Sequence, residues 1–217
     1  MPRIPIVDVH PVIEHGRYAA KASVGEPFPI RATVFREGHD RLGANVVLIS
    51  PDGVPHTRRR MTHEGDDRYE AWVTADRPGA WTFRVESWSD AYATWVHDAT
   101  VKIEAGVDAE LMLAEGGLLL TRAAGSLPRR AVTDRGTLEA AVTALGDASR
   151  PVEVRLAAGT SPEVTDVMER FPLRDLLDDS PAYPVFVDRE RAVAGAWYEF
   201  FPRSEGAYVD DDGAIVP

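Results

Sequence analysis

The chain reads AWTFRVESW from Ala80 to Trp88, with apolar and polar side chains in alternation. Trp81, Phe83 and Val85 share one parity, and successive side chains of a β-strand point to opposite faces of the sheet. The stretch therefore predicts a strand with one buried face. The same parity places Trp88 on the opposite, nominally polar face.

Other short β-rich runs flank this strand, and turn residues such as those of Pro51-Asp52-Gly53 separate them. Seven strands in about a hundred residues predict an antiparallel, immunoglobulin-like or fibronectin-like β-sandwich over residues 1–105. The expected strands are Ile4–Ile13, Phe28–Phe35, Ala44–Ile49, Thr57–Thr62, Tyr69–Thr74, Ala80–Trp88 and Thr94–Ile103.

Residues 106–182 change to helical spacing, and Leu173, Leu176 and Leu177 suggest a last short turn. Short amphipathic helices must bury their stripes against each other, so we expect a small α-helical bundle inserted into the sandwich. The expected stripes are Leu111, Ala114 and Leu118 after a cap at Asp108; Leu138, Ala141, Val142 and Leu145 before Gly146; and Val164, Val167, Met168 and Phe171 after Ser161-Pro162.

Residues 183–193 return to β character, and Tyr183–Asp188 is expected to rejoin the sandwich. A further strand is expected at Ala196–Phe201, within a last segment of residues 194–217. The whole pattern predicts the α+β class.

Composition limits the function classes. The chain has 217 residues, a net charge of −11 and no cysteine. The negative charge argues against binding nucleic acid, and the lack of cysteine excludes disulfides and fits a cytoplasmic location. No apolar run is long enough for a signal peptide or a membrane span, so no membrane partner is expected.

Catalytic, cofactor and metal sites are not predicted. The six histidines lack metal-ligand spacing, and no nucleotide-binding or nucleophile motif occurs. The aromatic residues are more informative, because strand parity puts Trp72 and Trp88 on the same class of outer face, with Tyr92 close in sequence. Sandwich pairing could make the strands of the two tryptophans neighbours or near-neighbours. Such rings either stack on sugars, dock another domain or lie under the helices. Covering or docking is the favoured interpretation, since exposed apolar patches usually mark protein contacts.

The segment VESWSDAYATWVHD, Val85 to Asp98, resembles the V-E-x-W-S-D-x-x-x-T-W-x-H-D pattern in the N-terminal domain of bacterial α-1,4-glucan:maltose-1-phosphate maltosyltransferases. These enzymes belong to the α-amylase clan and are similar to glycosyl hydrolase family 13. Further similar stretches follow in consistent order: Arg3–Ile6, Ala32–Asp40, Val187–Ala192 and, like a first barrel strand, Gly195–Ser204.

The resemblance implies a β-sandwich with a helical insert, followed by a (β/α)₈ barrel that would begin within residues 194–217. It implies an enzyme that transfers maltosyl units from maltose 1-phosphate to α-1,4-glucans with retention, as a homodimer. A retaining mechanism needs two carboxylates about 5 Å apart, and the family holds both on later barrel strands. The resemblance therefore implies a non-catalytic region, whose partners are its own barrel, a second copy and, through the barrel, maltose 1-phosphate and α-glucan.

Two main hypotheses remain at this stage. The chain is either a structural and dimerisation region of a maltosyltransferase or an α-glucan-binding module with Trp72, Trp88 and Tyr92 as its platform. A complete enzyme of unfamiliar type is the weaker third, because no constellation of residues supports it.

Overall fold

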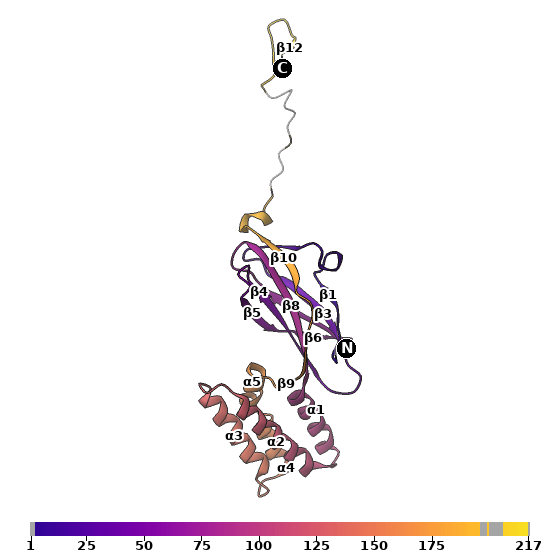
Figure 1. The fold of residues 1–217 in the computed structure, drawn as a ribbon, viewed down its shortest axis with the longest axis vertical. Helices are drawn as coiled ribbons and strands as arrows, with labels where there is room; N and C mark the ends of the chain where they lie inside the picture. Colours follow the sequence, from indigo (N-terminus) through magenta and orange to yellow (C-terminus); the bar gives the residue numbers. More distant parts are fainter. Residues whose placement is uncertain (1–2, 196–198, 200–205, 217) are drawn as a thin grey trace.

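The computed structural model describes residues 3–195, 199 and 206–216. Its fold is mixed α+β, which confirms the predicted class. The helices gather at one end of the strands, along the long axis of the molecule (Figure 1).

One sheet has four strands in the order β1-β3-β7-β6, all paired antiparallel. The first strand is shorter than the Ile4–Ile13 run predicted. It contains a register shift between Val7 and His10, and a 3₁₀ turn, η1, follows at Glu14–Gly16. The strands are β1 (Ile6–His10), β3 (Phe28–Val34), β7 (Arg68–Val73) and β6 (Thr62–Gly65).

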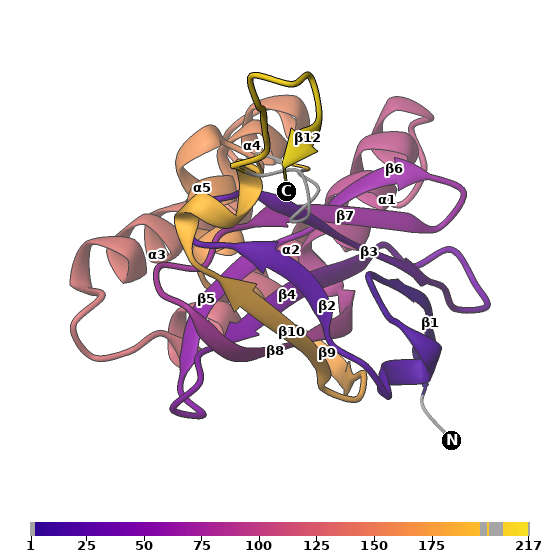
Figure 2. The ribbon, with the colours of Figure 1, turned by 90° about the horizontal axis from the view of Figure 1, so that it is seen from above.

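The second sheet has six strands in the order β2-β10-β8-β4-β5, with β9 added to β8. Its strands are β2 (Ala20–Ser23), β10 (Tyr183–Asp188), β8 (Gly79–Asp90), β4 (Leu42–Ile49), β5 (Pro55–Arg60) and β9 (Arg174–Asp179). The β2–β10 pair is parallel and lies side by side in Figure 2. The long strand β8 pairs with β10 along its first half and with β9 along its second.

The two sheets share one hydrophobic core. The predicted parity of β8 is confirmed, because Trp81, Phe83 and Val85 are fully buried in it. The four-stranded sheet contributes alternate residues of β3 and β7, such as Ile30 and Val73. Apolar faces of both sheets are thereby removed from water, which is the main stabilising contribution of this part.

The helical part has its own core. Its helices are α1 (Ala91–Glu104), α2 (Ala109–Ser126), α3 (Val132–Gly146), α4 (Val152–Gly159) and α5 (Pro162–Arg170). Two predicted stripes are confirmed: Leu138, Ala141 and Leu145 are buried from α3, and Val164, Val167 and Met168 from α5. The predicted cap is also present, since the Ser161 side chain accepts from Val164 N.

The strand expected at Thr94–Ile103 is wrong, because this segment lies in α1. Asp90 begins the helix as its N-cap, accepting a hydrogen bond from Ala93 N at 3.1 Å. Tyr92, Trp95 and Ala99 then point into the helical core at spacings of three and four residues. The helical part therefore starts at Ala91, inside the range 1–105 that was expected to be all β.

The stripe expected for α2 is also wrong. Leu111 and Leu118 are 53% and 74% exposed, and the buried face carries Met112, Leu113 and Leu120 instead. Gly116 decides this orientation, because its missing side chain admits the Trp95 ring. Gly116 is thus a packing residue of the helical core.

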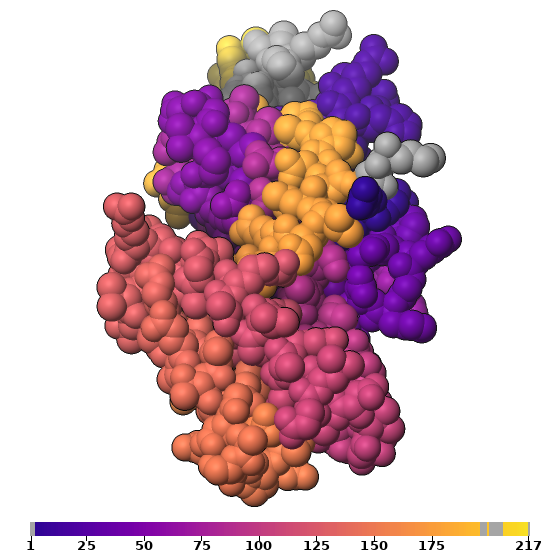
Figure 3. All heavy atoms as spheres, turned by 60° about the horizontal axis from the view of Figure 1, so that its bottom comes forward, coloured from indigo at the N-terminus to yellow at the C-terminus, as the bar shows by residue number. Residues whose placement is uncertain are grey.

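Leu176 and Leu177 were expected in a short turn, but they lie in β9, which pairs with Glu86–Asp90 of β8. The expected return strand at Tyr183–Asp188 is confirmed as β10. In Figure 3 the segment that contains these two strands, in amber, lies at the surface with other strand segments on both sides and the helical part below it.

A 3₁₀ turn, η2, follows at Glu190–Val193, and a small hairpin pairs β11 (Tyr208–Val209) with β12 (Ile215–Val216). The barrel strand expected at Ala196–Phe201 lies outside the described residues, apart from Glu199.

Candidate functional site

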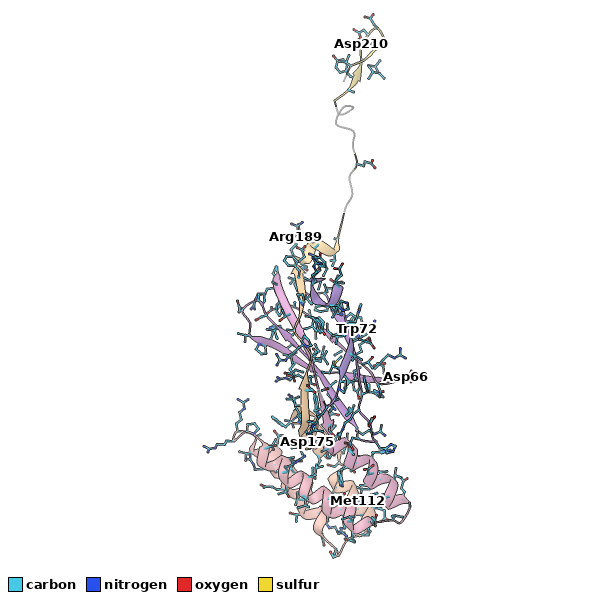
Figure 4. All side chains as sticks on the ribbon, turned by 45° about the vertical axis from the view of Figure 1, so that its right-hand side comes forward. Asp66, Trp72, Met112, Asp175, Arg189 and Asp210 are labelled. Carbon is cyan, nitrogen blue, oxygen red and sulfur yellow. The ribbon has the colours of Figure 1, made fainter. Side chains whose placement is uncertain are left out.

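Trp72 occupies the outer face of the four-stranded sheet, as parity predicted, and is 48% exposed. Its Nε1 donates to Glu70 Oε1 at 2.7 Å, and its carbonyl accepts from Arg59 Nη1 at 2.8 Å. Figure 4 shows it on the strand part, away from the helices that hold Met112. The indole of Trp72 is therefore partly exposed on this face and is held by its hydrogen bond to Glu70.

Trp88 is fully buried although it has the outward parity. Its ring lies across Gly43 of β4, where a side chain would collide with it. Two guanidiniums lie over the same ring, Arg60 with Cζ 4.6 Å and Arg174 with Cζ 5.1 Å from its centroid. Arginines from two other strands thus cover the Trp88 ring, and the sequence alone did not predict these two residues as its cover.

The structure does not bring the two tryptophans together. Trp72 lies in β7 and Trp88 in β8, and these strands belong to different sheets. Of the arrangements that sandwich pairing allowed, the one with neighbouring strands is not realised. A flat platform built from both rings is not available in this fold.

Tyr92, the third candidate, lines a cleft of about 730 Å³ between the strands and the helices α1 and α5. Its side chain is only 7% exposed, and its hydroxyl lies 3.2 Å from both Gly159 O and Thr165 Oγ1. Tyr69 of β7 lines the same cleft and donates to Leu42 O at 3.3 Å. Clefts at the junction of two structural units are common ligand sites.

Polar side chains from both units surround the cleft. Arg60 of β5 pairs with Asp90 at 2.7 Å, which ties the N-cap of α1 to the six-stranded sheet. Arg41 contacts Nδ1 of His97 in α1 at 3.2 Å and donates its backbone N–H to Thr94 Oγ1 at 2.9 Å. These contacts hold α1 against the strands, so the cleft has a defined shape.

Burial raises the pKa of the Tyr69 phenol above its ordinary value of 10.0, and burial likewise raises the pKa of Tyr92. Both rings are therefore neutral hydrogen-bonding groups at physiological pH. They can provide apolar contact and a fixed hydroxyl, but not a negative charge.

A second cluster of functional interest escaped the sequence analysis. Glu86 of β8 is 2% exposed, and the guanidiniums of Arg58, Arg84 and Arg174 all donate to it. Three consecutive arginines, Arg58-Arg59-Arg60, lie in β5. Period-2 parity did place Arg58 and Arg60 on one face, but only the pairing of β5, β4 and β8 brings them to Glu86 and Trp88.

Within the described residues, no three or more His, Asp or Glu side chains gather where they could hold a metal ion. In the same part of the chain, no helix combines the length and apolarity needed to cross a bilayer.

These features define an α+β module of two packed sheets with an attached helical bundle and a polar cleft at their junction. Residues 2–189 match the family model described as α-1,4-glucan:maltose-1-phosphate maltosyltransferase, domain N/S. The chain belongs to this family, as its Val85–Asp98 segment suggested.

Several enzymes with that name are similar over nearly the whole chain. Maltosyltransferase 2 of Streptomyces coelicolor is 54% identical over 206 residues, covering 94% of this chain and 30% of that protein. The enzyme of Arcanobacterium haemolyticum is 43% identical, with 97% and 30% covered. That of Mycobacterium tuberculosis is 39% identical, with 99% and 34% covered. The chain thus spans about a third of the length of these relatives.

Proposed function

We propose that this chain is the non-catalytic N-terminal region of a cytoplasmic maltosyltransferase that extends α-1,4-glucans from maltose 1-phosphate. Its role is structural: it supports a catalytic barrel and contributes to a homodimer. The match to domain N/S over residues 2–189 is the observation that carries this proposal.

We further propose that the two packed sheets form a sandwich of the immunoglobulin or fibronectin type. The shared core of β3, β7 and β8 and the largely antiparallel pairing support this assignment. We place the division between the strand part and the helical insert at Ala91, where α1 begins, with the return to the strands at β9.

The dimerisation role is supported by the exposed apolar face of α2. Leu111 and Leu118 are two helical turns apart and therefore project from the same face of the helix. Leu118 has the second-largest exposed fraction among the large apolar side chains described, at 74%. A second copy related by a two-fold axis would bury this face against itself or a neighbouring helix.

Sedimentation velocity of the 217-residue chain tests the dimer. We expect a concentration-dependent dimer that Leu118→Arg converts to monomer, because a buried unpaired charge is costly. The matched control is Val154→Arg on α4, where an apolar side chain 50% exposed is replaced without touching α2. A wild-type chain that stays monomeric at about 100 μM, or equal loss of dimer in both variants, would contradict this role.

The non-catalytic role is tested separately by phosphate release from maltose 1-phosphate with a maltooligosaccharide acceptor. We expect no turnover by this chain. Turnover that persists through purification and copurifies with the chain would overturn the proposal.

An α-glucan-binding module is the second candidate, and one observation favours it: Tyr92 and Tyr69 line the same cleft. Maltoheptaose binding would then depend on Tyr92 and not on Trp72, which lies on another face. Isothermal titration of wild type, Tyr92→Phe and Trp72→Ala with maltoheptaose separates the two functions. Binding that Tyr92→Phe weakens at unchanged stability would favour this second candidate over a purely structural role.

A further inference from the structure

Arg58, Arg84 and Arg174 surround Glu86 on the outer face of the six-stranded sheet, and we call these three arginines the arginine clamp. The clamp contains more positive charges than Glu86 can neutralise. Arg58 donates to Glu86 through Nε at 3.1 Å and Nη2 at 3.0 Å, while Arg84 and Arg174 each add one bond of 3.2 Å. Three guanidiniums thus meet one buried carboxylate, and the clamp carries two positive charges more than Glu86 neutralises.

The neighbouring acids reduce this surplus from two charges to one but do not remove it. Asp179 is 53% exposed and approaches Arg84 Nε only to 3.9 Å, and Asp90 is already paired with Arg60. With both of these acids and Arg60 counted, four guanidiniums still face three carboxylates. The face therefore has a positive surplus within a chain whose net charge is −11.

Most hydrogen-bond donors of the clamp have no partner among the described residues. A guanidinium has five N–H donors, yet the three arginines together make four hydrogen bonds, all of them to Glu86, among the described residues. Arg84 Nε is buried without any partner. Burial lowers the pKa of Arg174, and the nearby Arg58 and Arg60 lower it further against the opposing effect of Glu86.

Covering the sheet explains only part of this arrangement. Val47 and Trp88 are both fully buried on the outer face, where Arg58 and Arg84 are the cross-strand neighbours of Val47 and the Arg174 guanidinium lies over the Trp88 ring. Shielding requires stems but not a surplus of charge, and leucine or methionine would provide it without crowding. The side chains of Arg58, Arg84 and Arg174 also remain 44%, 28% and 26% exposed, so each is partly accessible to a ligand.

We propose that the guanidiniums of Arg58, Arg84 and Arg174 form a binding site for a tetrahedral oxyanion of the phosphate class. A phosphate group carries about −1.5 to −2 charges and three strong acceptor oxygens, which are opposite in sign to the surplus and complementary to the forked donors of the clamp. The ligand adds to the clamp while Glu86 stays in place beneath it. This site is independent of the proposed dimer and of the cleft.

The test is a titration of the arginine Nε–Hε signals of the ¹⁵N-labelled chain with sodium phosphate, at constant ionic strength maintained with sodium chloride. We expect saturable shifts of Arg58, Arg84 and Arg174 with half-saturation at roughly 1–10 mM. Sodium acetate is the second arm, and it should give no saturable shift because a monovalent carboxylate brings half the charge.

Arg58→Gln should weaken binding at least about fivefold, the loss of roughly one charged hydrogen bond. Arg31→Gln is the matched control, since Arg31 pairs with Glu70 on the other sheet and its loss should leave the titration unchanged. Should Arg58→Gln fail to fold, Arg58→Lys replaces it as the test variant. Lysine keeps the positive charge but lacks the paired N–H donors of a guanidinium, so its affinity for phosphate should lie between those of the wild type and Arg58→Gln. Shifts that acetate or chloride reproduce, shifts that fail to saturate, or shifts that Arg58→Gln and Arg58→Lys both leave intact would overturn the proposal.

Discussion

Gly116 in α2 lies against the indole of Trp95 in α1, and a Cβ atom on residue 116 would overlap the ring at Cζ2. The same indole donates from Nε1 to Met112 O at 2.7 Å. Trp95 also approaches Gly159 of α4, where a Cβ atom would lie 2.9 Å from Cη2. One ring thus fixes the distances between three helices, and two glycines make room for it.

Gly116→Ala should therefore destabilise the chain even though alanine is the better helix former. We expect a loss of about 1–3 kcal/mol in the free energy of unfolding, as for overpacking of a core. Gly117→Ala is the matched control, because a side chain there meets no atom within 4 Å. It should stabilise the chain by up to about 1 kcal/mol through helix propensity alone. Urea unfolding measures both values, and equal effects of the two substitutions would contradict this packing argument.

Glu86→Gln should be among the most destabilising single substitutions on the six-stranded sheet. It leaves the guanidiniums of Arg58, Arg84 and Arg174 without the buried carboxylate to which they donate. Breaking a buried ion pair from one side costs about 3–5 kcal/mol, and the partial exposure of the arginines places the expected loss near the lower end. Glu70→Gln on the other sheet, in a more exposed pair with Arg31, is expected to change the melting temperature far less.

Local signals made parts of this fold predictable from sequence. The β10 strand and the α5 helix lie where periodicity and the Ser161-Pro162 cap placed them, because their patterns are unambiguous over a short window. The prediction for the α1 segment was wrong because Trp95, Val101 and Ile103 share one parity and so fit the two-residue period of a strand. The buried helical set of Tyr92, Trp95 and Ala99 was not recognised.

The candidate site depended on contacts between distant segments. Parity assigned the correct face to Trp88, but its burial depends on Arg60 and Arg174, which only the order of strands β5, β4, β8 and β9 brings to its ring. The cleft at Tyr92 likewise arises from the docking of α1 and α5 onto the strands. Neither feature has a signature within a sequence window.

Trp88→Ala and Trp72→Ala should differ strongly, although both tryptophans have the outward parity. Trp88 is fully buried, and removing a buried aromatic side chain costs about 3–5 kcal/mol. Trp72 is 48% exposed, so its loss should cost less than about 1.5 kcal/mol. Chemical unfolding of the two variants measures the difference. Comparable losses would mean that Arg60 and Arg174 do not seal the Trp88 ring in solution.

The pair of Glu110 and Arg155 should make the stability of the helical part depend on acid. Arg155 is 5% exposed, its Nη1 and Nη2 contact the Glu110 carboxylate at 2.8 and 3.0 Å, and its Nε donates to Leu145 O at 2.8 Å. Hydrogen bonds from Arg155 lower the pKa of Glu110 below its ordinary value of 4.5. The folded state therefore binds the Glu110 proton less tightly than the unfolded state does. The stabilisation is fully present above pH 4.5 and is lost as the pH falls through the lower pKa of the folded state.

Glu110→Gln should accordingly lower the melting temperature at pH 7, and its curve should converge with that of the wild type as the pH falls below 4.5. Thermal unfolding followed by circular dichroism between pH 7 and pH 3 records this convergence. Glu115→Gln, also in α2 but without an ion pair among the described residues, is the control and should run parallel to the wild type. A constant offset between Glu110→Gln and wild type across the whole range would show that the Glu110–Arg155 pair does not contribute through charge.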